Sequence, residues 1–173
     1  MLPPAVALSL LVLLAVLLIM AGEAALSAHN SSVLRARGAV EPAGDVYRTM
    51  QWAYPVGFIA MAVEGAVTGL PAPGLLAAGL ALFGFAKALK IWVLTTLGVH
   101  WSFRVLVVPG APLVHAGPYR FMRHPNYLAV IGEIAGVALT VGATITGPLF
   151  LVGFGWLMWR RIGIEDAALG RHA

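Results

Sequence analysis

Residues 2–26 read LPPAVALSLLVLLAVLLIMAGEAAL, an apolar run in which Glu23 is the only charged side chain. Its length exceeds the roughly 20 apolar residues that an α-helix needs to cross a bilayer. It is also longer than the roughly 7–15-residue core of a secretory signal, and no lysine or arginine precedes it. This run therefore predicts a retained membrane helix rather than a cleaved leader.

The whole chain shares this apolar character. The 173 residues are 60% hydrophobic, have a mean hydropathy of +0.89 and include only 10% charged side chains. Soluble domains carry about 25% charged residues. The composition predicts an integral membrane protein in which residues 1–173 form a single domain. Cysteine is absent, which excludes disulfides, a thiolate nucleophile and a Cys-based metal site.

Four more apolar runs follow, and polar or Gly/Pro-rich stretches separate them. They cover about Met50 to Thr68, Leu75 to Leu97, Asn126 to Thr144 and Pro148 to Ile164. No alternating pattern suggests a β-barrel. The sequence predicts an all-α, polytopic membrane bundle of about five transmembrane helices, with a two-helix N-terminal part (1–74) and a core (75–173). The stretch from His29 to Arg48 is predicted to be a loop or surface segment.

The cations indicate how these spans are oriented. All 11 lysines and arginines lie on or toward the side that holds residues 29–48, residues 98–125 and the C-terminus. The positive-inside rule then places the N-terminus outside and the C-terminus in the cytoplasm. Lys87 and Lys90 lie toward the end of their run, and we expect their long stems to snorkel toward the same interface. The basic pI near 10.0 is thus a topology signal, and no nucleic-acid partner is expected.

One stretch, residues 117–127 (GPYRFMRHPNY), is dense in polar and cationic side chains. Such groups do not suit a lipid-facing helix, because each would lose its water without compensation. Pro118 and Pro125 also prevent one uninterrupted helix. We interpret the stretch as a shaped loop that lines a site. The alternative is a plain cytoplasmic loop whose Arg120 and Arg123 bind anionic lipid headgroups.

Several acids are candidates for the same region. Glu133 lies about 10 Å along the fourth helix and shares a face with Asn126 and Thr140. It is either a functional acid or the partner of Lys87 or Lys90. Arg161 and Glu165 are neighbours on one helix face, and their helix end is expected to fold back against residues 117–127. Glu64, placed at the outer interface, and Glu23, placed near the inner end of its helix, have no predicted catalytic role.

The common soluble-enzyme motifs are missing. There is no dinucleotide-binding or Walker loop, no nucleophile elbow and no H-E-x-x-H. The spacings of His100, His115 and His124 match no standard ligand pattern, so no metal site is expected.

Three linked motifs resemble the isoprenylcysteine carboxyl methyltransferase family of integral membrane methyltransferases. They are Gly117-Pro118-Tyr119-Arg120, then Arg123-His124-Pro125-Asn126-Tyr127, then Arg161 followed by Glu165-Asp166-x-x-Leu169. The likeness covers roughly residues 75–170. The segment Leu34-Arg35-Ala36-Arg37-Gly38-Ala39 is similar to the bacterial branch, which implies a bacterial inner membrane.

The resemblance implies a pocket for S-adenosylmethionine at the cytoplasmic ends of the last two helices. By position, its walls would be Tyr119, His124, Pro125, Asn126, Tyr127 and Glu165, with backbone contacts from Ala111, Pro112, Leu113 and Val114. Arg161 would face the substrate, His124 and Arg161 would serve catalysis, and Arg104 is a weaker polar contact. Relatives commonly continue beyond the position of Ala173 with another helical stretch, which implies either an incomplete lid over the pocket or a trimmed C-terminus.

The residue chemistry agrees with methyl transfer. A methyl sulfonium needs no covalent intermediate, so the protein mainly aligns the acceptor and excludes water. The expected acceptor is a lipophilic carboxylate, phenol or amine, and a small lipid suits the chain at least as well as a prenylated protein. The competing interpretation is a non-catalytic helical membrane protein that uses its basic loop to bind lipid or a partner. A transporter is disfavoured because five spans show no inverted repeat. The sequence does not specify the acceptor or the oligomeric state.

Overall fold

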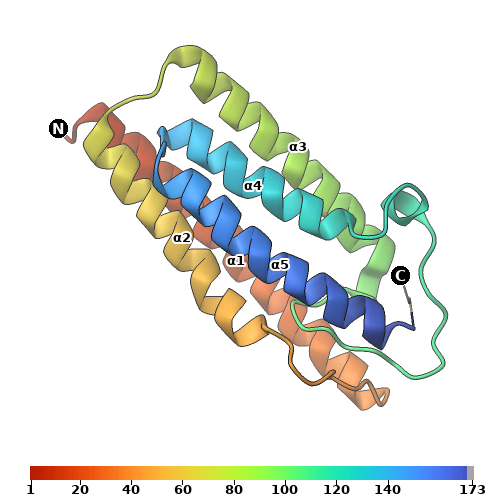
Figure 1. Ribbon diagram of the computed structural model, residues 1–173. Coiled ribbons are helices and arrows are strands. Elements are labelled where there is room, and N and C mark those ends of the chain that lie inside the picture. Colours follow the sequence, from red (N-terminus) through yellow and green to blue (C-terminus); the bar gives the residue numbers. More distant parts are fainter. Residues whose placement is uncertain (171–173) are drawn as a thin grey trace.

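A computed structural model describes residues 1–170, which form a bundle of five α-helices without a named β-strand (Figure 1). The helices are α1 (Pro4–Ala36), α2 (Tyr47–Thr68), α3 (Pro73–Leu97), α4 (Pro125–Val141) and α5 (Thr146–Ala168). Two short 3-10 turns, η1 (Gly98–His100) and η2 (Gly117–Arg120), lie between α3 and α4. The all-α prediction and the number of helices are therefore confirmed for this part of the chain.

Consecutive helices run antiparallel, so the connections alternate between two ends of the bundle (Figure 1). The N-terminus and the turns at 69–72 and 142–145 lie at one end. The loops 37–46 and 98–124 and the end of α5 lie at the other, which we call the loop end. Among the described residues, α1 and the segment Pro73–His100 are long and apolar enough to cross a membrane. Arg171, one of the cations counted above, lies outside the described residues.

The first helix is longer than predicted. It continues to Ala36, through residues that the sequence predicted to be a loop. Asn30 explains the difference, because its side-chain amide is buried and donates to the carbonyls of Trp101 (2.8 Å) and Gly98 (3.2 Å). Leu34 is also fully buried. The polar composition of this stretch therefore marks contacts with the loop end rather than a break in the helix.

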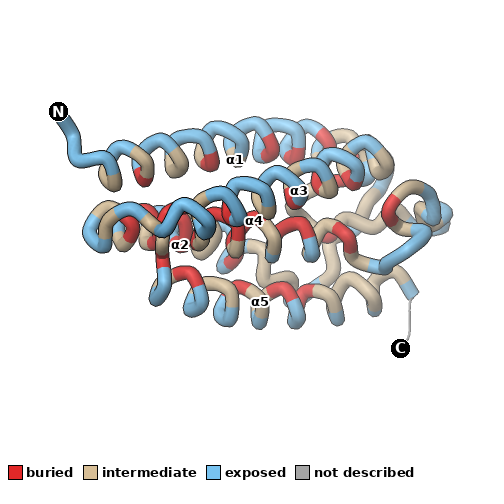
Figure 2. Tube along the Cα trace, turned by 90° about the horizontal axis from the view of Figure 1, so that it is seen from above, coloured by how far each residue is buried: buried red, intermediate tan, exposed pale blue. Residues whose placement is uncertain are grey.

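Glycines allow α3 and α4 to pack closely. A Cβ at Gly136 would lie 2.7 Å from the backbone nitrogen of Phe83, and one at Gly79 would lie 2.5 Å from that of Thr140. Gly132 and Gly136 are four residues apart on α4, as in the small-residue motifs that bring membrane helices together. With α2 and α5 also against it, α4 is the most buried helix (Figure 2).

Four charged side chains meet inside the bundle, and the expected snorkelling of Lys87 and Lys90 is wrong. Lys90 Nζ lies 3.0 Å from Glu23 Oε2 and 3.1 Å from Glu133 Oε1. Lys87 Nζ lies 2.9 Å from Glu23 Oε1 and 3.0 Å from Glu133 Oε2. Tyr54 donates its hydroxyl to Glu133 at 2.8 Å. The lysines stay inside the bundle because a buried charge needs a partner, and Glu23 and Glu133 lie within 3.1 Å of them.

This four-charge cluster decides between the two interpretations of Glu133. The carboxylate is the partner of both lysines, so the pairing alternative is the one that the structure shows. Glu23 lies well inside the extended α1 rather than near its end. The cluster joins α1, α3 and α4, and Tyr54 adds α2.

At the other end of the bundle, Glu64, which was predicted to be an interfacial residue, binds the start of α5. Its carboxylate accepts hydrogen bonds from the backbone nitrogens of Ile145 (2.9 Å) and Thr146 (2.7 Å). Both amides lie at the start of α5, where backbone N–H groups have no acceptor within the helix. Glu64 thus caps α5 from a neighbouring helix.

Candidate functional site

The polar stretch 117–127 builds the first wall of a site at the loop end. Pro118 lies in the first positions of η2, and Pro125 begins α4. The prediction that this stretch is not one helix is therefore confirmed. Gly117 has a φ of +56°, and a Cβ there would collide with the Thr96 side chain. Glycine is required where this turn passes over α3.

The end of α5 forms the second wall, as the predicted fold-back requires. Tyr127 donates its hydroxyl to Glu165 at 2.8 Å. His124 lies between two acids, with Nε2 3.2 Å from Asp166 and Nδ1 3.9 Å from Glu165. These contacts tie the start of α4 to the last turns of α5, so residues 38 to 42 positions apart in the sequence share one surface.

The segment after η1, residues 101–108, forms a third wall, and the N-terminal half of the chain supports it from outside. Residues 37–46, which we call the strap, pair with the segment after η1 through two backbone hydrogen bonds between Val40 and Val107 (2.9 and 3.0 Å). Glu41 forms ion pairs with Arg35 (2.6 Å) and Arg104 (2.8 Å). Burial raises the pKa of Glu41, but these two guanidinium groups outweigh it and hold the pKa below its usual value of 4.5.

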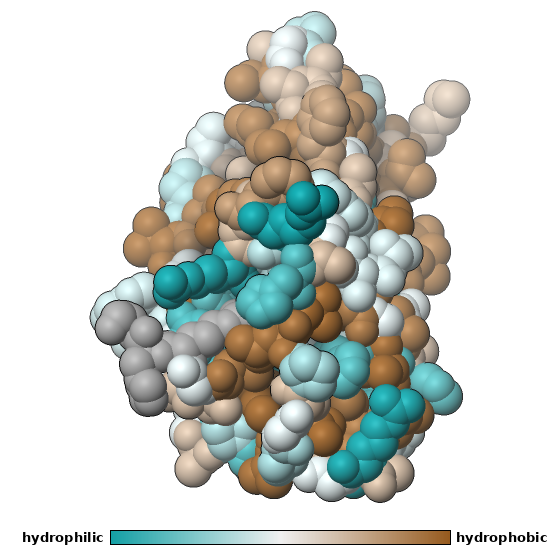
Figure 3. All heavy atoms as spheres, turned by 90° about the vertical axis from the view of Figure 1, so that its right-hand side faces the viewer, coloured by the Kyte–Doolittle hydropathy of each residue, from teal (hydrophilic) through white to brown (hydrophobic). Residues whose placement is uncertain are grey.

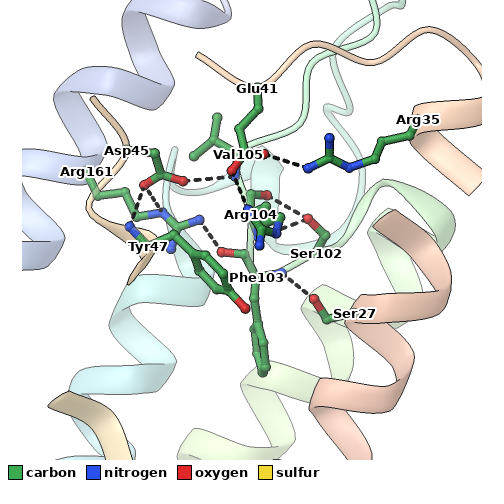
Figure 4. Close-up of polar contacts among 10 residues, drawn as sticks. All are labelled: Ser27, Arg35, Glu41, Asp45, Tyr47, Ser102, Phe103, Arg104, Val105 and Arg161. Atoms are coloured by element: carbon green, nitrogen blue, oxygen red, sulfur yellow. Dashed lines mark hydrogen bonds and ion pairs between the residues drawn. The ribbon is translucent and has the colours of Figure 1, made fainter. Parts of the chain in front are cut away.

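Arg161 lies where these walls meet (Figure 4). It is 7% exposed, and one terminal nitrogen donates to the carbonyl of Phe103. The other is 3.7 Å from the sulfur of Met50, and Nε is 3.6 Å from Asp45 Oδ1. Sequence reasoning placed Arg161 beside Glu165 on the same helix face. In the structure its charged partner comes from the strap instead.

Asp45 is the residue that sequence reasoning missed. Its side chain is 4% exposed and also accepts hydrogen bonds from the backbone nitrogens of Tyr47 (3.1 Å) and Val105 (3.4 Å). It belongs to the stretch from His29 to Arg48, which the sequence predicts to be a loop or surface segment. The one local signal was its position two residues before α2, where aspartate commonly binds the first free amides of a helix.

The walls enclose a cavity of about 370 Å³, lined by residues from all five helices and the loops. This lies within the usual range for small-molecule sites, roughly 300–1,000 Å³. One part, at the loop end, is polar and is lined by Tyr119, Arg123, His124, Asn126, Tyr127 and Glu165. The other is mainly apolar and is lined by Met20, Ala24, Met50, Val130, Phe154 and Met158, and Lys90 and Tyr54 of the charge cluster also line the cavity. Phe154 precedes Glu165 by 11 residues, about 16 Å of helix, so the cavity runs from the loop end deep into the bundle.

Nearly all the predicted site residues line this cavity. They are Ala111, Pro112, Leu113, Val114, Tyr119, His124, Asn126, Tyr127, Arg161 and Glu165. Pro125 is not among the lining residues, because it is fully buried where α4 begins. Arg104 lines the cavity, but its guanidinium binds Glu41 and lies 4.5 Å from the centre of the Tyr47 ring. Among residues 1–170 no three histidines or acids are grouped to hold a metal ion.

The two basic residues of the polar stretch differ in position. Arg123 lines the cavity, whereas Arg120 is exposed outside it. Figure 3 shows the loop end, where hydrophilic groups lie among hydrophobic ones. This arrangement can bind an elongated amphiphile or two ligands in contact, with charged and hydroxyl groups at the loop end and an apolar chain in the interior.

The chain is similar to a known protein family and to two bacterial proteins, and these matches include the helices α4 and α5 that carry the site. The profile of the isoprenylcysteine carboxyl methyltransferase (ICMT) family matches residues 79–171. The uncharacterized protein YpbQ of Bacillus subtilis (strain 168) is 31% identical over 162 residues, which cover 93% of this chain and 96% of YpbQ. An uncharacterized protein of Haemophilus influenzae is 25% identical over 145 residues, 83% of this chain and 84% of the relative. No solved structure matches the chain.

Proposed function

The chain belongs to the isoprenylcysteine carboxyl methyltransferase family, and on this premise we propose that it is an S-adenosylmethionine-dependent methyltransferase of the membrane. Its acceptor is lipophilic, an isoprenylcysteine-type carboxylate or a lipid phenol. The observation that carries the proposal is the cavity, because a polar part built from α4 and α5 continues into an apolar part inside the bundle. Methyl transfer between a polar donor and a greasy acceptor needs such a pair of environments.

The side chains at the loop end fit the chemistry of the donor. The carboxylate of S-adenosylmethionine suits Arg123 and His124, which can both donate hydrogen bonds. Its sulfonium suits the aromatic face of Tyr119, and its ribose hydroxyls suit Glu165 and Asn126. All five residues line the cavity. When bound, this cofactor supplies an electrophilic methyl group.

The chain's own residues would then bind and orient the acceptor. Arg161 lies beside the cavity between its polar and apolar parts, and its guanidinium would hold a carboxylate or phenolate oxygen. A carboxylate needs no proton acceptor, whereas a phenol does. Glu165 or His124 would take that role; in His124, Asp166 would hold the proton on Nε2 at 3.2 Å, and Nδ1, 3.9 Å from Glu165, would be the acceptor while Arg123 holds the cofactor carboxylate. The apolar walls exclude water from the acceptor.

We further propose that all five helices span the inner membrane of a bacterium, with the loop end in the cytoplasm. The support is the apolar outer surface, which includes Leu11, Leu18, Val56, Val67 and Trp159, together with the cations at the loop end. A lipid acceptor would enter between helices. A reporter fused to the C-terminus tests the orientation, and activity of that reporter on the outer side of the membrane would refute it.

The proposed reaction can be tested with the purified protein in detergent. We expect saturable binding of S-adenosylmethionine by equilibrium dialysis, and transfer of its radiolabelled methyl group to a membrane lipid extract. His124→Ala and Glu165→Ala should each weaken cofactor binding by about tenfold or more, the loss of about 1.4 kcal/mol or more that a charge-assisted contact represents. Arg120→Ala is the matched control, because this arginine belongs to the same stretch but does not line the cavity.

The alternative of a non-catalytic membrane protein predicts a different outcome. In that case the wild-type protein would show no saturable binding of the cofactor, and the three variants would be indistinguishable. If the protein binds S-adenosylmethionine but transfers no methyl group to the lipid extract, only the proposed class of acceptor would be wrong.

A further inference from the structure

We propose that Asp45, in the strap, is a positioning residue for methyl transfer, which holds the Arg161 guanidinium in the orientation that binds the acceptor. This rests on the proposed function. It assigns a role in the site to a residue outside the region 79–171 that the family profile matches. Figure 4 shows the carboxylate of Asp45 beside Arg161, with Tyr47 below them.

The contacts of Arg161 restrict it on two sides and leave a third open. One terminal nitrogen is bound to the carbonyl of Phe103, and Nε faces Asp45 at 3.6 Å. The remaining terminal nitrogen contacts the sulfur of Met50, which is a weak acceptor. Arg161 lines the cavity. Nε is buried and makes an ion pair but no hydrogen bond, so of the two terminal nitrogens this last one has the greater hydrogen-bonding capacity for a ligand.

Asp45 is itself held in place before it meets Arg161. Its two oxygens accept hydrogen bonds from the backbone nitrogens of Tyr47 and Val105, which belong to different segments. With only 4% of the side chain exposed, the carboxylate cannot turn toward solvent. A fixed negative charge beside an arginine whose side chain is 9% exposed sets the orientation of its guanidinium. This is the role expected of a residue that supports a binding group rather than contacting the ligand.

The strap keeps Asp45 there through contacts of its own. Val40 pairs with Val107, and Glu41 bridges Arg35 and Arg104. The guanidinium of Arg104 lies 4.5 Å from the centre of the Tyr47 ring, and that of Arg161 lies 6.0 Å from it. Arg35 is the outermost member, with 52% of its side chain exposed and no contact with Asp45 or the cavity. It offers a control that removes one exposed ion pair of the strap, because the contacts of Glu41 with Arg104 and of Val40 with Val107 remain and hold Asp45.

The test measures methyl transfer and cofactor binding for Asp45→Asn, with Arg35→Gln as the control. Asparagine keeps the shape and one acceptor oxygen but removes the charge. We expect kcat for the acceptor to fall by about 30- to 100-fold, the lower part of the range for truncating one partner of a buried charge pair, because asparagine keeps one acceptor oxygen. The dissociation constant of S-adenosylmethionine should stay within about threefold, because Asp45 does not line the cavity. Arg35→Gln should keep kcat within about threefold.

A double-variant cycle separates positioning from a merely structural role. Arg161→Lys keeps a charge but cannot make the two-sided contact of the guanidinium. If Asp45 acts through Arg161, Asp45→Asn should lower kcat by less than about threefold in the Arg161→Lys background. Losses that multiply, or a wild-type kcat in Asp45→Asn, would overturn the proposal.

A second readout does not depend on activity. In ¹⁵N-arginine spectra of the protein in micelles, the Nε signal that disappears in Arg161→Lys identifies this side chain. We expect slow exchange of its Nε–H with water in the wild type and exchange at least about tenfold faster in Asp45→Asn. Fast exchange in the wild type would refute the positioning role. Absence of methyl transfer by a wild type that shows the slow signal would refute the proposed function instead.

Discussion

Replacing Glu133 by glutamine should strongly destabilise the bundle, because it leaves a buried positive charge. Glu133 and Glu23 balance Lys87 and Lys90, so the cluster is neutral. The side chains of Glu133 and Lys90 are 3% and 4% exposed, which leaves almost no water to solvate an unpaired charge. Removing one partner of a buried pair costs about 3–5 kcal/mol. For a chain of this length that corresponds to a fall in the melting temperature of roughly 6–20 °C.

Tryptophan fluorescence during heating in detergent measures this change, since the chain has five tryptophans. The companion variant Glu133→Gln/Lys90→Met restores neutrality and should recover at least half of the lost melting temperature. Tyr54 can still donate its hydroxyl to the glutamine oxygen, so loss of that hydrogen bond does not confuse the comparison. A Glu133→Gln protein that melts within about 2 °C of the wild type would refute the reasoning, as would a double variant less stable than the single one.

Three further predictions follow from packing, capping and titration. Gly136→Ala should cost about 1–3 kcal/mol, because its Cβ would press on the backbone of Phe83, whereas Gly84→Ala, with open space around it, should not destabilise the protein; melting temperatures check both. Glu64→Ala should cost about 0.5–2 kcal/mol by uncapping α5, and faster amide hydrogen exchange at residues 145–147 would report it. The lowered pKa of Glu41 means that its ion pairs stabilise the fold above pH 4.5 and lose this effect as the pH falls through the lowered value. The melting temperature of the wild type should therefore fall more steeply with acid than that of Glu41→Gln, and equal slopes would contradict the assignment.

Much of the candidate site was predictable because its parts are local in the sequence. Tyr119, His124, Asn126 and Tyr127 lie in one polar stretch, and the two prolines prevent a regular helix there. Glu165 stands at a helix end, in the same arrangement as the family motif. These residues line the cavity. Pro125 was grouped with them by its place in the motif, yet its ring is buried as the start of α4.

Asp45 and the four-charge cluster were harder to predict, because their meaning depends on partners far away in the chain. Asp45 and Arg161 are 116 positions apart, and no pattern near either residue indicates the other. The prediction for Lys87 and Lys90 was based on the general expectation that cations near the end of a membrane helix reach toward the interface. That expectation failed because Glu23 and Glu133, from two other helices, offer them charges at about 3 Å.

By itself, the sequence determined that the protein is a helical bundle with its polar chemistry at one end. Apolar run length and the placement of prolines and cations are properties of single segments, and each segment carries them wherever it lies in the fold. Only the tertiary structure decided which helices approach closely, which partner each buried charge has, and that Asp45 of the strap lies beside Arg161. The physical reason is that the free energy of a buried ion pair or a glycine contact depends on both partners. These partners lie far apart in the sequence, and nothing near either one identifies the other.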